Sequence, residues 1–445
     1  MLTLPSPAPD QNPPRQAGDP AGVLGRLGKP QTGFPPPPKR IDRQARRSRK
    51  LKLRDGLRRF TDNPRARRCG NTACDASGVG IRVADTPNGR RAGFSGLETC
   101  GSVWLCPVCA AKIAAQRAEE LQHVLKNAQH AGHQIAMVTL TVRHDRNDSL
   151  QSVWDAVAAG WHRVTSGAPW KRLVARHGIA GWAKAVEVTH GANGWHVHVH
   201  AVIAHQSTQA QAMGTEIFGR WNAGIESVGF TAETGPGVDV QVAGDDLSKL
   251  GLYLAKLGAD LPSLAREATQ GGQKHARGTN RTPFQIAADL IENGEAEDAA
   301  IWAEWTRTAP GHRALSWSKN FRKDFGLTTE EQDDVTIAAT ETGTDDDTIL
   351  VLPNETWKKL RHRSHFLLDY AENHGPTALK NWLTTNGYPW NHPPTNTPTH
   401  QHTHSPTHTP TNAHTHLPRT YRLKLTSTKT TLQMRDEEGG WSWSR

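Results

Sequence analysis

Three histidines at alternate positions constrain the fold of this chain more than any other feature. They are His196, His198 and His200, within the stretch GWHVHVHAVIA (residues 194–204). Successive side chains of a β-strand point to opposite faces, so the three imidazoles share one face and the intervening valines share the other. The stretch therefore predicts a strand with one face packed on a core and one polar face able to bind a ligand.

A second strand, AGWAKAVEVTH (180–190), is joined to the histidine strand by the turn GANG (191–194). In a hairpin closed by this turn, Glu187 lies opposite His198, within a register slip of one or two residues. Two imidazoles and a carboxylate in such proximity suit a divalent metal with open coordination positions, such as Mn²⁺, Zn²⁺, Co²⁺ or a hydrated Mg²⁺. The alternative is that the histidines are polar residues on a solvated face.

The elements around this hairpin predict the fold class. We expect strands and helices at these positions: strands at 134–142, 180–190, 195–204 and 238–243, and helices at 110–129, 149–166, 207–226 and 245–258. From residue 134 the order is β-α-β-β-α-β, followed by one more helix. This order predicts an α+β fold, an antiparallel four-stranded sheet of ferredoxin-like arrangement. Its helices would cover one face and leave the other free to carry a site.

One of the four tyrosines, Tyr253, lies in LGLYLAKLGAD on the helix expected after the last strand, and Lys256 follows on the same helix face. Such a helix can lie along the open face of the sheet, near the histidines. A tyrosine beside a metal is a candidate nucleophile, although a phenol with a pKa of about 10 needs help from a metal or a base. Taken alone, a tyrosine and a lysine at this spacing more often belong to an ordinary amphipathic helix.

Five cysteines precede the sheet. A CPVC motif comes directly before a helix and a second pair lies about thirty residues upstream, which is typical of a structural zinc site. We expect four ligands, with Cys100 able to replace any of them: Cys69, Cys74, Cys106 and Cys109. Reduced thiols without a metal are the alternative.

A basic segment precedes the cysteines. Between Lys39 and Arg68 there are 14 lysines and arginines against 3 acidic residues, which accounts for the whole net charge of +10. Such a segment is typical of contact with nucleic acid or an anionic membrane, and a solvated basic tail is equally compatible with it. If the partner is DNA, we expect contacts from Arg46, Arg47, Arg49, Lys50, Arg67 and Arg68.

Taken together, the motifs resemble the HUH endonuclease superfamily, and in particular the rolling-circle replication initiator (Rep) proteins of actinobacterial plasmids. The resemblance covers residues 67–325 and is carried by RRCG, FSGLETCGSVWLCPVCAAKIAAQRAEEL, NGWHVHVHAVI, GLYLAKLGAD, RTPFQIAADL and ALSWSKNF. It implies the following roles: His198 and His200 as the metal pair with His196 as an additional residue, Glu187 as third ligand, Tyr253 as nucleophile and Lys256 as charge partner. Some members carry a glutamate one helical turn before the tyrosine, where this chain has Lys249.

The resemblance implies a plasmid replication initiator that uses Mn²⁺ or Mg²⁺, besides a structural Zn²⁺, to nick and rejoin single-stranded DNA through a 5′-phosphotyrosine intermediate. Its partners would be single- and double-stranded DNA at the origin, a host polymerase and a helicase, with no membrane. Two alternatives stay open: a non-catalytic zinc-dependent DNA-binding protein, and a transposase or mobilisation nickase of the same superfamily. With no apolar targeting segment in view, we expect a cytoplasmic protein.

The expected organisation has eight segments: a disordered Pro-rich lead (1–38), a basic arm (39–68), a Cys-rich zinc module and helix (69–131), an HUH endonuclease domain (132–290), a helical extension (291–328), an acidic linker (329–353), a small helical segment (354–388) and a disordered His/Thr/Pro-rich tail (389–445).

Overall fold

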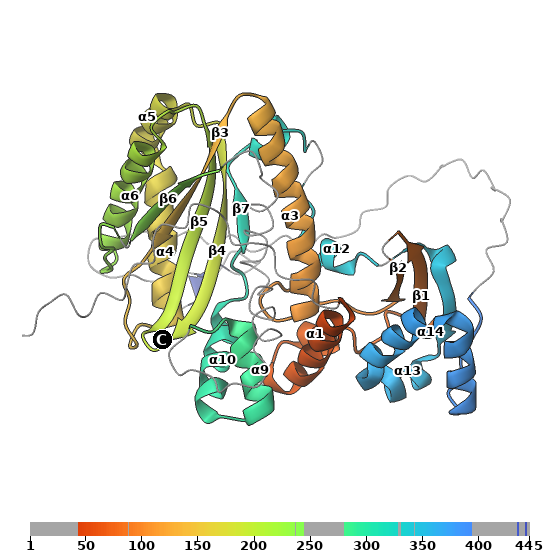
Figure 1. Cartoon of the computed structure of the whole chain (residues 1–445). Helices are drawn as coiled ribbons and strands as arrows, with labels where there is room; N and C mark the ends of the chain where they lie inside the picture. The colour runs from red at the N-terminus through yellow and green to blue at the C-terminus, as the bar shows by residue number, and fades with distance from the viewer. Residues whose placement is uncertain are drawn as a thin grey trace, which may run out of the picture. The chain divides into compact units, whose positions relative to one another are not determined.

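The computed structural model describes residues 43–393, except 88, 236, 244–279, 328–330 and 342, together with two short strands near the C-terminus (Figure 1). The chain divides into two units, residues 1–393 and 394–445. In the second unit the described residues form one antiparallel pair, β9 (Met434–Arg435) with β10 (Trp441–Ser442). The Pro-rich lead, the expected helix at 245–258 and the histidine-rich part of the tail lie outside the described residues.

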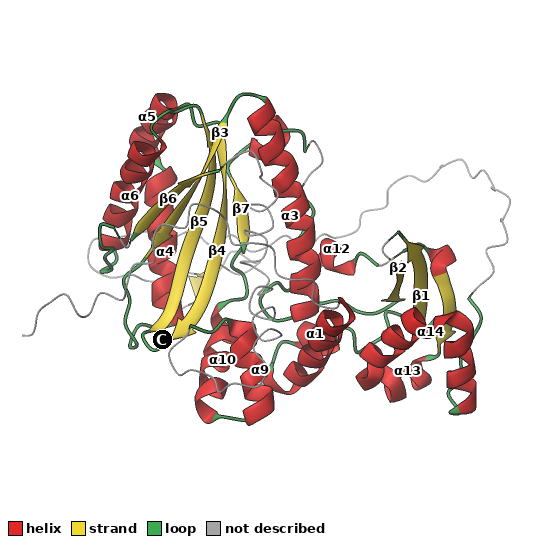
Figure 2. Ribbon diagram, in the orientation of Figure 1, coloured by secondary structure: helices red, strands yellow, loops and turns green. Residues whose placement is uncertain are grey.

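A five-stranded antiparallel sheet, in the order β6-β3-β5-β4-β7, carries the histidines (Figure 2). Its strands are β3 (Gln134–Thr141), β4 (Gly181–Gly191), β5 (Gly194–His205), β6 (Val238–Val242) and β7 (Leu315–Trp317). The α+β class and the antiparallel sheet are confirmed. The sheet has five strands rather than the expected four because β7 pairs with the outer edge of β4, with Trp317 opposite Ala183.

Three helices pack against one face of this sheet: α4 (Leu150–Thr165), α5 (Gly167–His177) and α6 (Ala210–Glu226). Figure 1 shows them together on one side of the strands. Ser149 caps the N-terminus of α4, since its hydroxyl accepts a hydrogen bond from Ser152 N at 3.1 Å. The buried valines Val197 and Val199 of β5 belong to the same apolar core as Ile217 of α6. The valine face of the histidine strand is therefore the core face.

We had expected the opposite face of the sheet to be free of helices, and this prediction is wrong. Helix α3 (Pro107–His130) covers part of it, and Leu121 and Leu125 pack with Met137 of β3 and Val202 of β5. The apolar stripe of α3 continues to its C-terminal end, which explains this cover. The histidines occupy the same face of β5 beyond this apolar cluster, so the candidate site lies at one end of the face rather than across its whole width.

Two further helices follow the 244–279 gap: α9 (Pro283–Asn293) and α10 (Ala296–Thr308). Helix α9 starts with a capping box between Thr282 and Gln285. Trp302 and Trp305 of α10 are buried in the main core. A short helix, α11 (Phe321–Asp324), comes after β7, and its Phe321 belongs to the same apolar cluster as Leu121 and Leu125 of α3.

The basic segment is helical and packed. It forms α1 (Arg43–Leu57), the short 3-10 helix η2 (Arg58–Phe60) and α2 (Pro64–Arg68). Leu51 and Leu57 on α1 are 5% and 3% exposed, so this helix is anchored by an apolar side. The expected basic arm is thus a part of the folded unit.

A second, three-stranded sheet has the order β2-β1-β8. It consists of β1 (Val79–Thr86), β2 (Gly89–Ser95) and β8 (Thr348–Leu352), and α13 (Asn354–Leu360), the 3-10 helix η4 (Arg361–Arg363) and α14 (Ser364–Thr385) follow it. Ile81, Leu350 and Trp357 are fully buried in its core.

The segment 329–353, expected to be an acidic linker, instead contains α12 (Asp334–Ala339), the 3-10 helix η3 (Asp345–Asp347) and β8. The expected tail also begins later than residue 389, since Asn391 pairs with Val351.

Glu372 on α14 ties α1 to the second sheet. Its carboxylate accepts hydrogen bonds from Arg47 Nη1 at 2.6 Å, Gln44 Nε2 at 2.8 Å and Ala92 N at 2.8 Å. Burial raises the pKa of this carboxyl group, but the hydrogen bonds and the charge of Arg47 outweigh it and hold the pKa below its ordinary value of 4.5. Glu372 therefore stabilises the fold in its charged form.

We expect Glu372→Gln to lower the free energy of unfolding at pH 7 by about 2–4 kcal/mol. Because the folded pKa is depressed, the contribution is complete above pH 4.5 and is lost as the pH falls through the folded pKa. Urea unfolding of wild type and variant at several pH values measures both effects. Glu355→Gln, at an exposed residue of α13, is the control and should change little. An unchanged acid dependence in Glu372→Gln would contradict this assignment.

Candidate functional site

The hairpin register agrees with the sequence analysis. Glu187 of β4 lies opposite His198 of β5, and the hairpin closes with Gly191 opposite Gly194. Gly194 has a φ of +83°, a left-handed conformation that favours glycine and allows the tight turn. The local turn chemistry thus places the carboxylate and the imidazoles on the same face.

His200 is the most firmly held of the three histidines. It is 5% exposed, with Nε2 at 3.1 Å from Glu187 Oε2 and Nδ1 at 3.1 Å from Thr139 Oγ1. The rings of His196, His198 and His200 stack nearly parallel, at centroid distances of 5.8 and 6.4 Å. The three imidazoles therefore do share one face, and Thr139 fixes the orientation of the deepest one.

The donor types of this face fit a divalent ion. Two imidazoles and a carboxylate are common ligands, and a threonine behind one imidazole orients it as outer-shell groups do in metal sites. In the described part of the chain, His198 does not bring its ligand atoms within 4.8 Å of both His200 and Glu187. The structure thus shows a His200–Glu187 pair in contact and His198 beside it.

The protonation states also suit metal binding. Burial raises the pKa of Glu187, but the hydrogen bond and charge of His200 outweigh it and lower the pKa overall. Burial, with the neighbouring His200 adding to it, lowers the pKa of His198, and burial together with His144 lowers the pKa of His196 to about 4. At neutral pH the carboxylate is ionised, and the imidazoles of His196 and His198 are neutral, as metal ligands must be.

His144, which the sequence analysis missed, contacts this face from the loop after β3. Its Nε2 lies 2.7 Å from His196 Nδ1, and its Nδ1 lies 3.0 Å from the carbonyl oxygen of Asn193. His196 therefore has an imidazole partner of its own, away from Glu187. A single histidine in a polar loop carries no periodic signal, and only the tertiary fold brings it here.

The candidate nucleophile Tyr253 and its neighbour Lys256 lie outside the described residues. The chain enters this gap from β6, where Ala243 N donates to the Ile135 carbonyl at 2.8 Å. It returns at Arg281, which forms an antiparallel bridge with His190 of β4. In the sheet order β6-β3-β5-β4-β7, the strands at these two described flanks, β6 and β4, lie on opposite sides of the histidine strand.

Four buried cysteines form the second candidate site: Cys69, Cys100, Cys106 and Cys109. The sulfur of Cys69 lies 3.5 Å from that of Cys109 and 3.7 Å from that of Cys106, and the sulfur of Cys100 lies 3.6 Å from that of Cys109. Hydrogen bonds from Cys100, Cys106 and Cys69 lower the pKa of Cys109, which lies in the first turn of α3, where the helix dipole also favours a thiolate. Four converging sulfurs are the ligand set of a tetrahedral structural zinc site.

The zinc prediction needs one correction, because Cys74 is not part of this group and Cys100 takes its place. Cys74 is exposed, and its backbone N–H donates to the Gly96 carbonyl at 2.9 Å. The preceding residue, Ala73, forms an antiparallel bridge with Leu97. This pairing holds the Cys74 backbone against the 96–98 segment.

The family of replication proteins matches residues 96–211 of this chain. The matched region contains the histidine strand, Glu187 and three cysteines of the buried group. Over this segment, about a quarter of its length, the chain is similar to replication proteins. It is 28% identical over 352 residues to "Protein rep" of Streptomyces lividans, which covers 64% of this chain and 77% of that protein.

Over 150 residues it is 32% identical to a "Neomycin resistance protein" of Streptomyces cyanogenus, covering 28% of this chain and 34% of that protein. Among solved structures, a hydantoinase/carbamoylase family amidase from Burkholderia ambifaria aligns with a TM-score of 0.16 and 12% identity, over 48% of this chain and 47% of that one. Such a score is too low to indicate a common fold. Among the helices that the structure describes, none has the length and apolar character of a membrane span.

Two of the α1 residues that we expected to contact DNA, Arg47 and Lys50, instead interact with other parts of the protein. Arg47 forms ion pairs with Asp369 at 2.5 Å and with Glu372 at 2.6 Å. Burial, with the charge of Arg46 as a second cause, lowers the pKa of Lys50 to about 8. Arg47 and Lys50 thus take part in the packing between α1 and its neighbours, and both are partly exposed, as Arg46 is.

The other three residues expected to contact DNA are Arg49, Arg67 and Arg68, and they differ in their hydrogen bonds and exposure. Arg67 Nε donates to the Thr61 carbonyl at 2.7 Å, and Arg68 forms an ion pair with Glu98 at 2.7 Å, about half of the Arg68 side chain being exposed. Arg49 on α1 is partly exposed. A DNA-binding role of these six residues therefore stays a proposal.

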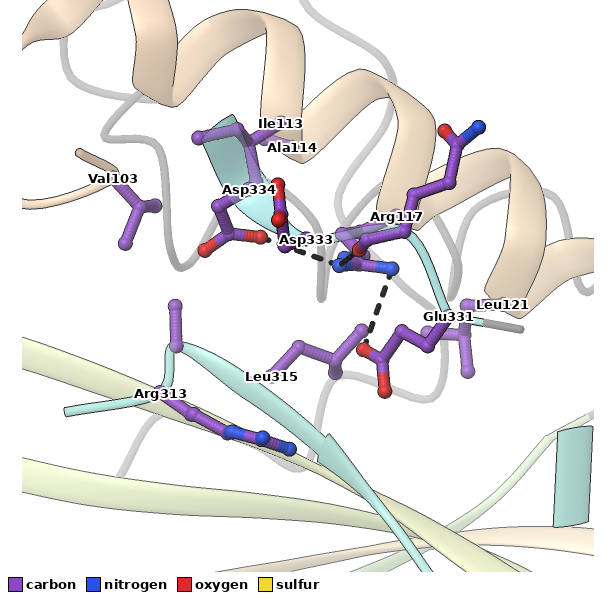
Figure 3. A pocket seen from close by; sticks show the side chains of 12 residues that line it. Val103, Ile113, Ala114, Arg117, Leu121, Arg313, Leu315, Glu331, Asp333 and Asp334 are labelled. Atoms are coloured by element: carbon purple, nitrogen blue, oxygen red, sulfur yellow. Dashed lines mark hydrogen bonds and ion pairs between the residues drawn. The ribbon is translucent and has the colours of Figure 1, made fainter. Parts of the chain in front are cut away.

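A cavity of about 250 Å³ between α3 and the β7 edge is lined by apolar and charged side chains (Figure 3). Arg117 of α3 lies in it, with Glu331 and Asp334 each at 3.3 Å. Arg117 also forms an ion pair with Glu120 at 2.9 Å. These ion pairs hold the 331–334 segment to α3, and no histidine lines the cavity.

Proposed function

We propose that this protein initiates rolling-circle replication of a plasmid by nicking one DNA strand and rejoining it, in the manner of HUH endonucleases. The contact of His200 with Glu187 on the polar face of the sheet carries this proposal. The match to replication proteins supports it, because the matched region includes these residues. The strand order β6-β3-β5-β4 is the one that a ferredoxin-like arrangement has, with β7 as an addition.

In this proposal His198, His200 and Glu187 hold a divalent ion such as Mn²⁺ or Mg²⁺. When bound, the ion offsets the negative charge that develops on the scissile phosphate. Thr139 holds the His200 ring so that Nε2 points to Glu187. The ionised state of Glu187 and the neutral state of His198 prepare the site at neutral pH.

Tyr253 is proposed as the nucleophile. Its phenol oxygen forms a bond to phosphorus while the bond from phosphorus to the 3′ oxygen breaks, which leaves a free 3′-OH and a 5′-phosphotyrosine link. The phenol proton passes to solvent, a proton from solvent completes the 3′-OH, and Lys256 balances the negative charge of the phosphate. Attack of a 3′-OH on the phosphotyrosine rejoins the strand without ATP, and the free 3′-OH primes a host polymerase that works with a helicase.

A denaturing gel with an end-labelled single-stranded oligonucleotide that carries a plasmid nick region tests this proposal. With Mn²⁺ we expect a slowly migrating, protease-sensitive adduct, and with EDTA we expect none. A native gel run in parallel reports binding. Tight binding in Mn²⁺ without any adduct would contradict the nicking function and favour a zinc-dependent DNA-binding protein.

A further inference from the structure

A hollow rich in arginine lies among α4, α5 and α6, which pack on the valine face of the sheet. It has a volume of about 350 Å³ and is open to solvent. Four arginines from the three helices line it together with one carboxylate: Arg163, Arg172, Arg176, Arg220 and Glu216. Because the histidines occupy the other face of β5, this hollow is on the opposite side of the sheet from the candidate nicking site.

Two of the four arginines already have structural partners. Arg220 caps the C-terminal end of α4, since its Nε donates to the Val164 carbonyl at 2.9 Å and its Nη2 donates to the Ser166 carbonyl at 2.7 Å. Arg176 forms an ion pair with Glu216 at 2.6 Å. The single carboxylate of the lining is thereby neutralised, and it also contacts His177.

The other two arginines are uncompensated. Arg163 and Arg172 are exposed, and within the described residues neither guanidinium group has a hydrogen bond or an ion pair. Burial lowers the pKa of Arg220, and the charges of Arg163 and Arg172, which line the same hollow, lower it further. Cations held together without a counter-charge form a site for an anion with several oxygens, and guanidinium groups match phosphate in shape.

We propose that this hollow binds the phosphate backbone of double-stranded DNA next to the nick region. The inference rests on the proposed function, which makes DNA the partner. A duplex fits better than a single strand because the lining contains no aromatic side chain on which unpaired bases could stack. The protein would then hold the origin on two sides of its sheet, with the strand to be cut at the histidines and the flanking duplex at α4–α6.

The double variant Arg163→Gln/Arg172→Gln tests this inference. Both side chains are exposed, so the variant should fold, and Arg220 is left in place because it caps α4. Fluorescence anisotropy with a duplex of about 30 base pairs, measured over a range of salt, should give a slope of log affinity against log salt that is shallower by about 2, and an affinity lower by roughly 50-fold near 0.1 M salt. Binding of a single-stranded oligonucleotide and adduct formation should stay as in wild type.

Arg307→Gln/Lys323→Gln is the matched control, because it removes the same net charge at two exposed residues away from the hollow. An equal loss of duplex affinity in the control, or none in the test variant, would overturn the inference. Thermal unfolding with and without inorganic phosphate tests whether the hollow holds a free anion instead. If the test variant is no longer stabilised by phosphate but keeps its duplex affinity, the inference is also overturned. If wild type forms no adduct but the test variant still loses duplex affinity, the nicking function fails and the duplex site stands.

Discussion

Replacing His200 with asparagine should reduce nicking in Mn²⁺ by about a thousandfold, the scale expected when a metal ligand is lost. The asparagine amide can reach the position of Nδ1 beside Thr139, but it provides no group at the position of Nε2 beside Glu187. The variant therefore removes the nitrogen that faces the carboxylate and keeps the packing on β3. Adduct formation on the labelled oligonucleotide measures the rate, and calorimetric titration with Mn²⁺ measures the affinity for the ion.

His196→Asn is the matched control on the same strand face. Because His196 contacts His144 rather than Glu187, its replacement should change the Mn²⁺ affinity much less than His200→Asn does. Tyr253→Phe should remove the adduct entirely and leave Mn²⁺ affinity unchanged, since a phenyl ring has no oxygen to attack phosphorus. If His200→Asn bound Mn²⁺ and cut DNA as wild type does, the proposed metal site would be wrong.

Cys106→Ser should release the zinc ion and destabilise the part of the chain that joins α2 to α3. Binding energies of structural zinc are of order 10 kcal/mol, so the loss of one thiolate should prevent stable folding of this region rather than weaken it slightly. Cys106 precedes α3, whose residues pack in both apolar clusters of the main sheet, and the damage should extend to DNA binding. Zinc content by atomic absorption and thermal unfolding with and without EDTA measure these effects.

Cys74→Ser is the control for that experiment. Cys74 is exposed and lies outside the buried group, so this variant should keep its zinc and its melting temperature. Cys100→Ser should behave like Cys106→Ser. Zinc retained in Cys100→Ser but lost in Cys74→Ser would mean that the expectation from sequence spacing was right and the buried group is not the metal site.

Local patterns were sufficient to predict the hairpin. Alternation along β5 and a turn with a glycine fix the register, so the pairing of Glu187 with His198 follows from residues 180–204 alone. The contact between His200 and Glu187 could not be predicted from these residues alone, because it depends on side-chain conformation and on Thr139 from β3. Tyr253 and Lys256 stay predictions.

Contacts between distant segments could not be predicted. The choice between Cys74 and Cys100 depends on how residues 70–74 pair with 96–98, and spacing along the chain does not contain this information. The same holds for the cover that α3 provides over the histidine face, and for His144. The acidic composition of 329–353 suggested a linker, but the short apolar run TILVL within it forms β8 when β1 is available.

The pairing of β1 with β8 has a consequence for synthesis of the protein in the cell. Val79 lies opposite Leu352, which is 273 positions later in the chain. At translation rates of about 5–20 residues per second, the nascent β1–β2 hairpin waits roughly 15–55 seconds for its third strand. During that time one edge of β1 has no partner and can pair with another nascent chain. Shortened products that end before residue 348 keep this edge permanently, so they should aggregate or be degraded rather than persist as smaller folded proteins.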